Sequence, residues 1–344
     1  MTPLKMVSPD IPTALLVNAK SRRGRQFFAE YEARCQQSLR LVRSQLTESR
    51  DAMERELEWA RHRGIRRIIV GGGDGTLSFA ANSLVNTDAV MGVLPLGTGN
   101  TFAHGLGLPG SPSELVRLLA QGPVAAYDVG LASNGSKQTV ILNSLTLGFS
   151  ERLVELLSQD RKSRWGYLAW TMEVRRALKN TPVLHVHLSW PTGQESYTTR
   201  QLVVVNGRTV AAGISATPLS SAQDGLLEVF RLGGPSVTSM AWLSLKLLIG
   251  TLLTDRQAHY HAVPEVTIHT HPAVTASIDG DIWLTPPIHC RVLPQALWVI
   301  SPHKAGPSTP KRWPLATRTV GAPGRILPLP SSYAPPEIRD QPPT

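Results

Sequence analysis

The stretch "RIIVGGGDGTLSFAANSLV", residues 67–85, places four glycines and one aspartate between an apolar run and a helical pattern. Residues 68–70 have the apolar character of a buried strand. The apolar residues after the glycines recur at the spacing of an amphipathic helix: Leu77, Ala80, Ala81, Leu84 and Val85. A glycine loop that ends on a helix N-terminus lets backbone N–H groups approach an anion closely. The stretch therefore predicts a phosphate site at a strand end, although glycines also serve tight turns and close packing.

A second loop of the same kind follows the next apolar run. In "VLPLGTGNTFAHGLGLP", residues 93–109, Thr98 offers a hydroxyl group between two glycines, with Asn100 beside them. Two such loops at neighbouring strand ends form a two-sided cradle, which indicates a nucleotide. Neither loop has the spacing of a Walker A motif or of a dinucleotide-binding fingerprint.

The chain divides into two predicted domains and a tail. Residues 10–127 alternate apolar strands with helices, which predicts an α/β nucleotide-binding domain with a parallel sheet. Within it, a strand at 13–18 precedes a long polar helical region that includes 51–63. Residues 128–293 read as short strands between turns and predict a β-rich antiparallel sandwich, after which a strand at 294–302 returns to the first domain. Residues 304–344 hold ten prolines and predict a disordered tail.

Composition limits the partners and the compartment. The net charge of +10 indicates an anionic partner, and without a recognisable nucleic-acid motif an anionic membrane surface is favoured over nucleic acid. Two cysteines and no signal peptide pattern suit a reducing compartment. The longest apolar stretch, 240–253, is interrupted by Lys246 and is too short to span a bilayer. We expect a cytoplasmic protein that associates peripherally with membranes; a homodimer is left open.

The two loops together resemble the diacylglycerol kinase catalytic-domain family, which includes bacterial lipid kinases, sphingosine kinases and ceramide kinases. The resemblance begins at "LLVNAKSRRGR" (15–25) and ends at "ALWVI" (296–300), with agreement in order and spacing between them. Its later landmarks are "YDVG" (127–130), "LNSLTLGF" (142–149), "LVVVNG" (202–207), "AQDGLLEVF" (222–230) and "SIDGD" (277–281). NAD kinases share only the "GGDGT" element.

The resemblance implies a two-domain kinase that binds ATP between its domains and phosphorylates a hydroxyl of diacylglycerol or a related lipid held by the second domain. By position, the ATP loop comprises Gly72, Gly73, Asp74, Gly75, Thr76, Leu77 and Ser78, with Thr98 opposite and Thr47 as a further nucleotide contact. The Mg²⁺ site corresponds to Asp224 with the carbonyl groups of Ser221 and Leu226, and the general base to Asp281. Asp74, beside phosphates, is expected to help handle Mg²⁺ or to cap the helix that follows.

Three positions depart from the family pattern. The family has Glu where this chain has Asp281, Asp where it has Thr101, and Asn-Glu where it has Ser78 and Phe79. These changes keep two alternatives open: a catalytically weak lipid- or nucleotide-binding regulator, and a kinase of NAD or of a soluble alcohol.

Other polar and aromatic groups have simpler interpretations. The histidine pairs in "HVH" (185–187), "HYH" (259–261) and "HTH" (269–271) are expected on solvent-facing strand positions rather than around zinc. The basic residues at 20–25 either meet phosphates or lie on the solvated surface. The aromatic residues at 165–170 are expected in the core rather than in an interfacial belt.

Overall fold

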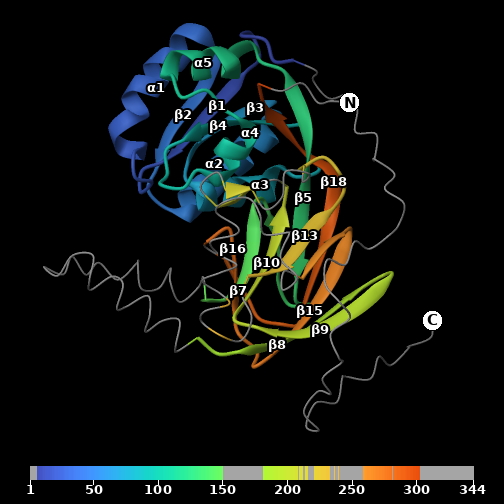
Figure 1. The fold of residues 1–344 in the computed structure, drawn as a ribbon. Coiled ribbons are helices and arrows are strands. Elements are labelled where there is room, and N and C mark those ends of the chain that lie inside the picture. Colours follow the sequence, from blue (N-terminus) through green and yellow to red (C-terminus); the bar gives the residue numbers. More distant parts are fainter. Residues whose placement is uncertain are drawn as a thin grey trace, which may run out of the picture.

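The computed structural model describes residues 6–149, 181–207, 209–211, 214–215, 221–232, 236, 239, 259–280 and 282–302. These residues form an α/β part and a β sandwich, which lie one above the other in Figure 1. The predicted fold class, a mostly parallel α/β domain with an antiparallel sandwich, is therefore confirmed. The predicted tail, the aromatic segment at 165–170, the apolar stretch at 240–253 and Asp281 lie outside the described residues.

The α/β part is built on four parallel strands in the order β2-β1-β3-β4. They are β1 (Thr13–Asn18), β2 (Leu41–Thr47), β3 (Arg67–Gly72) and β4 (Val90–Pro95). The helices are α1 (Gly24–Ser38), α2 (Arg50–His62), α3 (Asp74–Leu84), α4 (Thr101–Leu106) and α5 (Pro112–Gln121). β1 and β3 read as continuous apolar runs because helices cover both faces of the sheet.

The long polar helical region predicted after β1 is wrong, because strand β2 interrupts it. The segment "LVRSQLT" has three consecutive polar residues at 43–45 and lies at the sheet edge, where six of its seven residues are not fully buried. An edge strand does not need a continuous apolar run, so the hydrophobic pattern alone does not reveal it. The predicted helix at 51–63 is present as α2, and the Ser49 side chain caps it by accepting the Ala52 N–H.

Two long strands join the α/β part to the sandwich. β5 (Val124–Ser133) and β18 (Ile288–Ile300) pair with each other along most of their length. The end of β18 also pairs in parallel with β4, so one sheet runs through both parts. The expected boundaries after residues 127 and 293 fall inside β5 and β18.

The sandwich places a second antiparallel sheet against the lower half of the first. The lower half of the first sheet adds β6 (Gln138–Ile141), β8 (Leu184–Trp190), β9 (Gly193–Thr199) and β15 (Glu265–His271). The second sheet has the order β14-β13-β10-β7-β16-β17. Its strands are β7 (Ser144–Gly148), β10 (Gln201–Asn206), β13 (Leu227–Arg231), β14 (Tyr260–Val263), β16 (Ala276–Ile278) and β17 (Ile282–Leu284). A separate small hairpin consists of β11 (Thr209–Ala211) and β12 (Ile214–Ser215). Within the described residues, no helix has the length and apolar character to cross a membrane.

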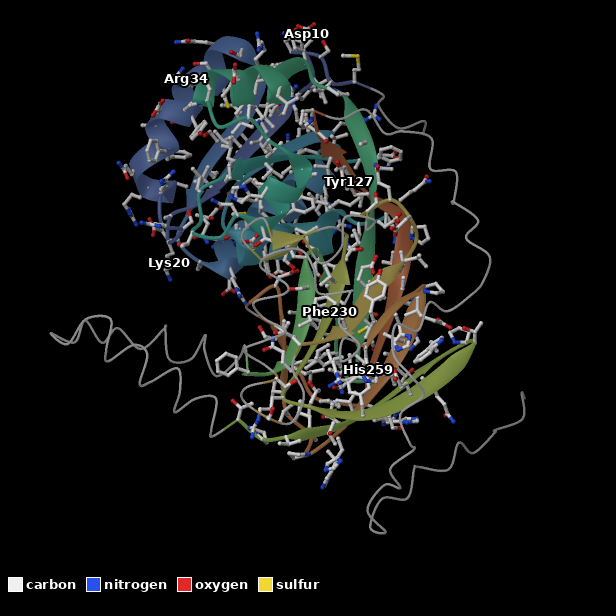
Figure 2. All side chains as sticks on the ribbon, viewed as in Figure 1. Asp10, Lys20, Arg34, Tyr127, Phe230 and His259 are labelled. Carbon is white, nitrogen blue, oxygen red and sulfur yellow. The ribbon has the colours of Figure 1, made fainter. Side chains whose placement is uncertain are left out.

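The histidines of "HYH" do not face solvent, contrary to the prediction. Figure 2 labels His259, which lies in the sandwich part of the molecule. His261 is 6% exposed, and His259 and His261 each contact a carboxylate oxygen of Glu195 at 2.5 Å. Because Glu195 lies on β9 and His261 on β14, this contact joins the edge strands of the two sheets. The other two pairs lie on β8 and β15, where His185 and His271 are exposed.

Candidate nucleotide and metal site

The first glycine loop connects β3 to α3. Gly73 precedes the helix with a φ of −91° and has no side chain to cap it. A Cβ on Gly72 would lie 2.5 Å from the Cβ of Thr76, so only glycine fits beside the first turn of α3. The loop therefore leaves the N-terminus of α3 free of side chains on the strand side, as the sequence predicts.

The second glycine loop packs directly against the first. A Cβ on Gly97 would lie only 2.4 Å from the Cα of Gly73. The loop is closed by Asn100, whose φ is +48° and whose side chain accepts the Gly97 N–H and donates to the Gly97 carbonyl. Thr98, at the tip of this loop, is exposed. The two predicted loops thus meet backbone to backbone.

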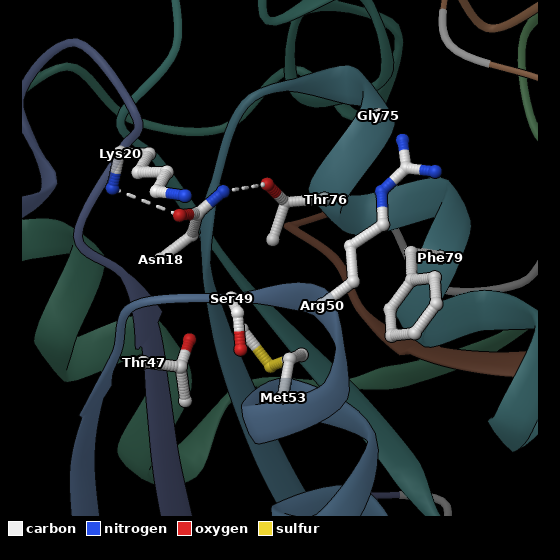
Figure 3. A pocket seen from close by; sticks show the side chains of 9 residues that line it. All are labelled: Asn18, Lys20, Thr47, Ser49, Arg50, Met53, Gly75, Thr76 and Phe79. Atoms are coloured by element: carbon white, nitrogen blue, oxygen red, sulfur yellow. Dashed lines mark hydrogen bonds between the residues drawn. The ribbon is translucent and has the colours of Figure 1, made fainter.

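A cavity of about 240 Å³ lies at the carboxyl ends of β1 and β2, beside the first turns of α2 and α3. Figure 3 shows its lining: Asn18, Lys20, Thr47, Ser49, Arg50, Met53, Gly75, Thr76 and Phe79. Asn18 connects the strand ends to α3, because its amide donates to the Thr76 hydroxyl at 2.8 Å and its oxygen accepts the Lys20 N–H. Open α/β sheets bind ligands at this edge.

The structure brings together some of the predicted nucleotide contacts and separates others. Thr47, Gly75 and Thr76 line one cavity, and Lys20 from the basic segment joins them. Leu77 is fully buried in the core and can offer only its backbone. Thr98 is not among the residues that line the cavity.

Asp74 does not cap its own helix, so that prediction is wrong. Its Oδ1 accepts the backbone N–H of Phe102 at 3.0 Å, near the start of α4, and lies 3.4 Å from the side-chain nitrogen of Asn143. Asp74 is the first residue of α3 and points across to the second loop and to the β6–β7 connection. Its carboxylate therefore holds the two loops together.

Asp279, which was not predicted as a site residue, occupies the centre of the contact between α3 and the sandwich. It accepts the Ser78 hydroxyl at 2.7 Å, so Ser78, predicted to contact ATP, directs its side chain to the sandwich. The signal was present in "SIDGD", but by the family resemblance the role of base went to Asp281, which lies outside the described residues.

The loop around Asp224 is closed by its own carboxylate. Asp224 accepts the N–H of Ser221 and the N–H of Leu226, each at 3.0 Å, so the three predicted metal residues lie in one turn. Burial and, to a smaller extent, the charge of Asp128 together raise the pKa of Asp224 to about 6, although these two hydrogen bonds lower it. Asp128 binds the same turn by accepting the Gly225 N–H at 2.7 Å.

In the part of the chain that the structure describes, no larger metal cluster accompanies this turn. Among the residues that the structure describes, no group of three or more His, Cys, Asp or Glu side chains is arranged to hold a metal ion. A carboxylate with backbone carbonyl groups nevertheless supplies the oxygen ligands that Mg²⁺ prefers, and Mg²⁺ commonly uses one or two carboxylates and keeps several waters.

Comparisons with known proteins agree with this architecture. Residues 12–132 match the diacylglycerol kinase catalytic domain, and residues 144–301 match the YegS C-terminal NAD kinase beta sandwich-like domain. A "probable lipid kinase YegS-like" from Pseudomonas savastanoi is 30% identical over 241 residues, covering 70% of this chain and 77% of the relative. One from Chromohalobacter salexigens is 28% identical over 247 residues, with the same coverage.

Solved structures show the same fold. A putative diacylglycerol kinase from Bacillus anthracis superposes with a TM-score of 0.69 at 22% identity, over 85% of this chain and 97% of that one. The chain therefore belongs to the family of YegS-like lipid kinases, which carry a diacylglycerol kinase catalytic domain.

Proposed function

We propose that this chain is an ATP- and Mg²⁺-dependent kinase that transfers the γ-phosphate to a hydroxyl of diacylglycerol or a related lipid. The observation that carries the proposal is the cavity at the carboxyl ends of β1 and β2, where Thr47, Gly75 and Thr76 converge next to Lys20. The cavity has the polar, partly cationic lining that a polyphosphate requires.

The nucleotide would use both ends of this cavity. Backbone N–H groups of the first turn of α3 and the ammonium group of Lys20 suit the phosphates, because the helix dipole and the cation both favour negative charge. Met53 and Phe79 give the lining an apolar part that suits the base. The glycine loop residues 72–75 would approach the phosphates closely, and Thr98 would reach the nucleotide from the second loop.

Mg²⁺ would be held by Asp224 with the carbonyl groups of Ser221 and Leu226. The raised pKa of Asp224 reflects a carboxylate that is buried beside the charge of Asp128, and a cation relieves that cost. When bound, Mg²⁺ supplies charge neutralisation for phosphoryl transfer. Asp74 would contribute by holding the two loops at the phosphates.

The acceptor hydroxyl would give its proton to Asp281, the position that matches the family's general base. A carboxylate there orients the hydroxyl and removes its proton as the bond to phosphorus forms. The lipid would be reached at an anionic membrane surface, which the net charge of +10 attracts in a salt-dependent way.

A phosphate-transfer assay tests the proposal. Purified protein is incubated with radiolabelled ATP, Mg²⁺ and, in separate reactions, diacylglycerol, monoacylglycerol, sphingosine, glycerol and NAD. We expect labelled lipid that depends on Mg²⁺, with Asp281→Asn lowering turnover by roughly 10²–10⁴ while ATP binding persists. Asp281→Glu should retain activity because it restores the family's carboxylate.

The alternatives predict different products. Label in glycerol or NAD alone would show a kinase of a soluble acceptor. ATP binding without transfer by both the wild type and Asp281→Glu would show a regulator, and the lipid kinase proposal would fail.

A further inference from the structure

Asp279 lies in the turn between β16 and β17, where it is half-buried and has an unusual backbone conformation. Its φ is +50°, in the left-handed region that non-glycine residues seldom adopt, and Gly280 follows at +82°. Strands β16 and β17 pair up to this turn through Ile278 and Ile282. A conformation of this kind persists only where surrounding contacts fix it.

Four hydrogen bonds fix the Asp279 carboxylate, and they come from two separate parts of the chain. One donor is the hydroxyl of Ser78 on α3, at 2.7 Å. The others are the backbone N–H groups of Leu142, Asn143 and Ser144, at 2.9, 2.8 and 3.0 Å. The Asp279 N–H donates in return to the Ser144 carbonyl at 2.9 Å. One carboxylate thus joins the nucleotide helix to two segments of the sandwich.

The β6–β7 connection carries this contact back to the glycine loop. Asn143, whose N–H binds Asp279, places its side-chain nitrogen 3.4 Å from the Oδ1 of Asp74. Its carbonyl accepts the N–H of Asn206 at 2.8 Å, which ties it to the middle of the second sheet. Asp74, the first residue of α3, therefore contacts segment 142–144 directly, and Ser78, the fifth, is linked to it through the Asp279 carboxylate.

The energetics favour a rigid contact. Burial raises the pKa of Asp279, because a buried carboxylate has lost its hydration, while the Ser78 hydroxyl and the three backbone N–H groups favour the ionised form. Hydrogen bonds to a charged group contribute about 1.5–3 kcal/mol each, and an unsatisfied buried group costs at least as much. If α3 slid along the sandwich, the hydrogen bond from the Ser78 hydroxyl would break, and Oδ2 of Asp279 would lose one of its donors.

We propose that Asp279 is a positioning residue for phosphoryl transfer: acting through Ser78, it fixes the distance between the glycine loop and the β16–β17 turn of the sandwich. The inference rests on the proposed function, in which ATP binds on the α3 side and the lipid on the sandwich side. Reaction between two such groups depends steeply on their separation, and a misplacement of about 1 Å can cost about 10²-fold in rate.

Asn82 provides a matched control, because it also joins α3 to the sandwich. Its amide nitrogen donates to the Ser78 carbonyl at 3.0 Å, and its oxygen accepts the Val140 N–H at 3.0 Å and the Thr139 hydroxyl at 3.3 Å. Asn82 lies one turn further from the glycine loop and does not contact Asp279. A contact that only stabilises the fold would be as important at Asn82 as at Ser78.

Steady-state kinetics of Ser78→Ala, Asn82→Ala, Asp279→Asn and the Ser78→Ala/Asp279→Asn double variant test the proposal in the full chain. Ser78→Ala should lower kcat about 10- to 100-fold with the KM for ATP within about twofold of the wild type. Asn82→Ala should keep kcat within about twofold of the wild type, even where its Tm falls as far as that of Ser78→Ala. In the Asp279→Asn background, Ser78→Ala should have no further effect, since the two act as a unit. Equal losses of kcat in Ser78→Ala and Asn82→Ala would overturn the proposal.

Hydrogen exchange separates this proposal from the proposed function, because it requires no lipid product. Addition of ATP should slow exchange at the amides of residues 142–144 in the wild type and in Asn82→Ala, but not in Ser78→Ala. If the wild type phosphorylates no lipid, the proposed lipid kinase function fails, and the exchange measurement alone decides whether the coupling exists. If ATP does not change the exchange rate of these amides in the wild type, the coupling is refuted. Should Asp279→Asn fail to fold, the comparison with Ser78→Ala still provides the test.

Discussion

Gly97→Ala is predicted to push the two glycine loops apart and to abolish most of the activity. The new Cβ would lie 2.4 Å from the Cα of Gly73. Carbon atoms in contact prefer about 3.5–4.0 Å, so the loops must separate by about 1 Å. The Cα and N of Gly73, at 2.4 and 3.2 Å from the new Cβ, are backbone atoms that cannot rotate away. Overpacking of this kind costs about 1–3 kcal/mol in stability, and a shift of about 1 Å at the phosphates costs about 10²-fold in turnover.

The assay measures phosphate transfer, ATP binding and Tm for Gly97→Ala beside Gly110→Ala. Gly110 is the matched control because it is exposed, and a Cβ added there meets nothing within 4 Å. We expect Gly110→Ala to behave as the wild type and Gly97→Ala to lose ATP affinity and turnover, with a lower Tm. Wild-type ATP binding and turnover in Gly97→Ala would refute the reasoning that the contact of the two loops holds the nucleotide site in place.

Two further predictions follow from titrating groups. Because the pKa of Asp224 is raised to about 6, protons compete with Mg²⁺ for its carboxylate below that pH. The Mg²⁺ affinity measured by calorimetry should therefore fall up to tenfold per pH unit below about pH 6. An affinity that does not change between pH 7 and pH 5 would contradict this prediction. For Glu195, burial alone would raise the pKa, but hydrogen bonds with His259 and His261 outweigh it and lower the pKa to about 2. Denaturant titrations of Glu195→Gln should show that its free energy of unfolding at pH 7 is lower than that of the wild type by up to about 3 kcal/mol. This difference should shrink as the pH falls from about 4.5 to 2. A difference that does not change with pH would contradict the pairing of Glu195 with the two histidines.

The glycine loops and the strands before them could be predicted because local sequence determines them. β1 and β3 are covered on both faces, so each is a continuous apolar run that pattern detects directly. The two loops follow parallel neighbours β3 and β4, and parallel strands end at the same edge of a sheet. Sequence order alone therefore placed Gly73 and Gly97 near each other.

The contacts that cross between segments could not be predicted in this way. For Asp74 the sequence left two roles open, handling of Mg²⁺ and capping of its own helix, but the partner of its carboxylate is set by the second loop, which approaches only in the folded state. Asp279 and Ser78 are 201 residues apart, and neither a period nor a motif spacing relates them. Likewise, the carboxylate that binds "HYH" comes from β9, so strand alternation alone indicated an exposed face.

Thr101 shows how a departure from the family pattern changes the way the two loops are held. The position that a Cβ on Gly99 would take lies 3.2 Å from Asp74 Oδ2 and 3.6 Å from Thr101 Oγ1, so both side chains border the same small space. An aspartate at 101, as the family pattern has it, would bring a second carboxylate beside Asp74, and two carboxylates that share a site require a cation or a proton between them. With threonine there, the loops are held by the backbone contact of Gly73 with Gly97 and by the hydrogen bond from the Phe102 N–H to Asp74, neither of which needs a metal. The junction of the loops in this chain therefore does not itself call for a divalent cation, and the Mg²⁺ site that we propose is the turn at Asp224.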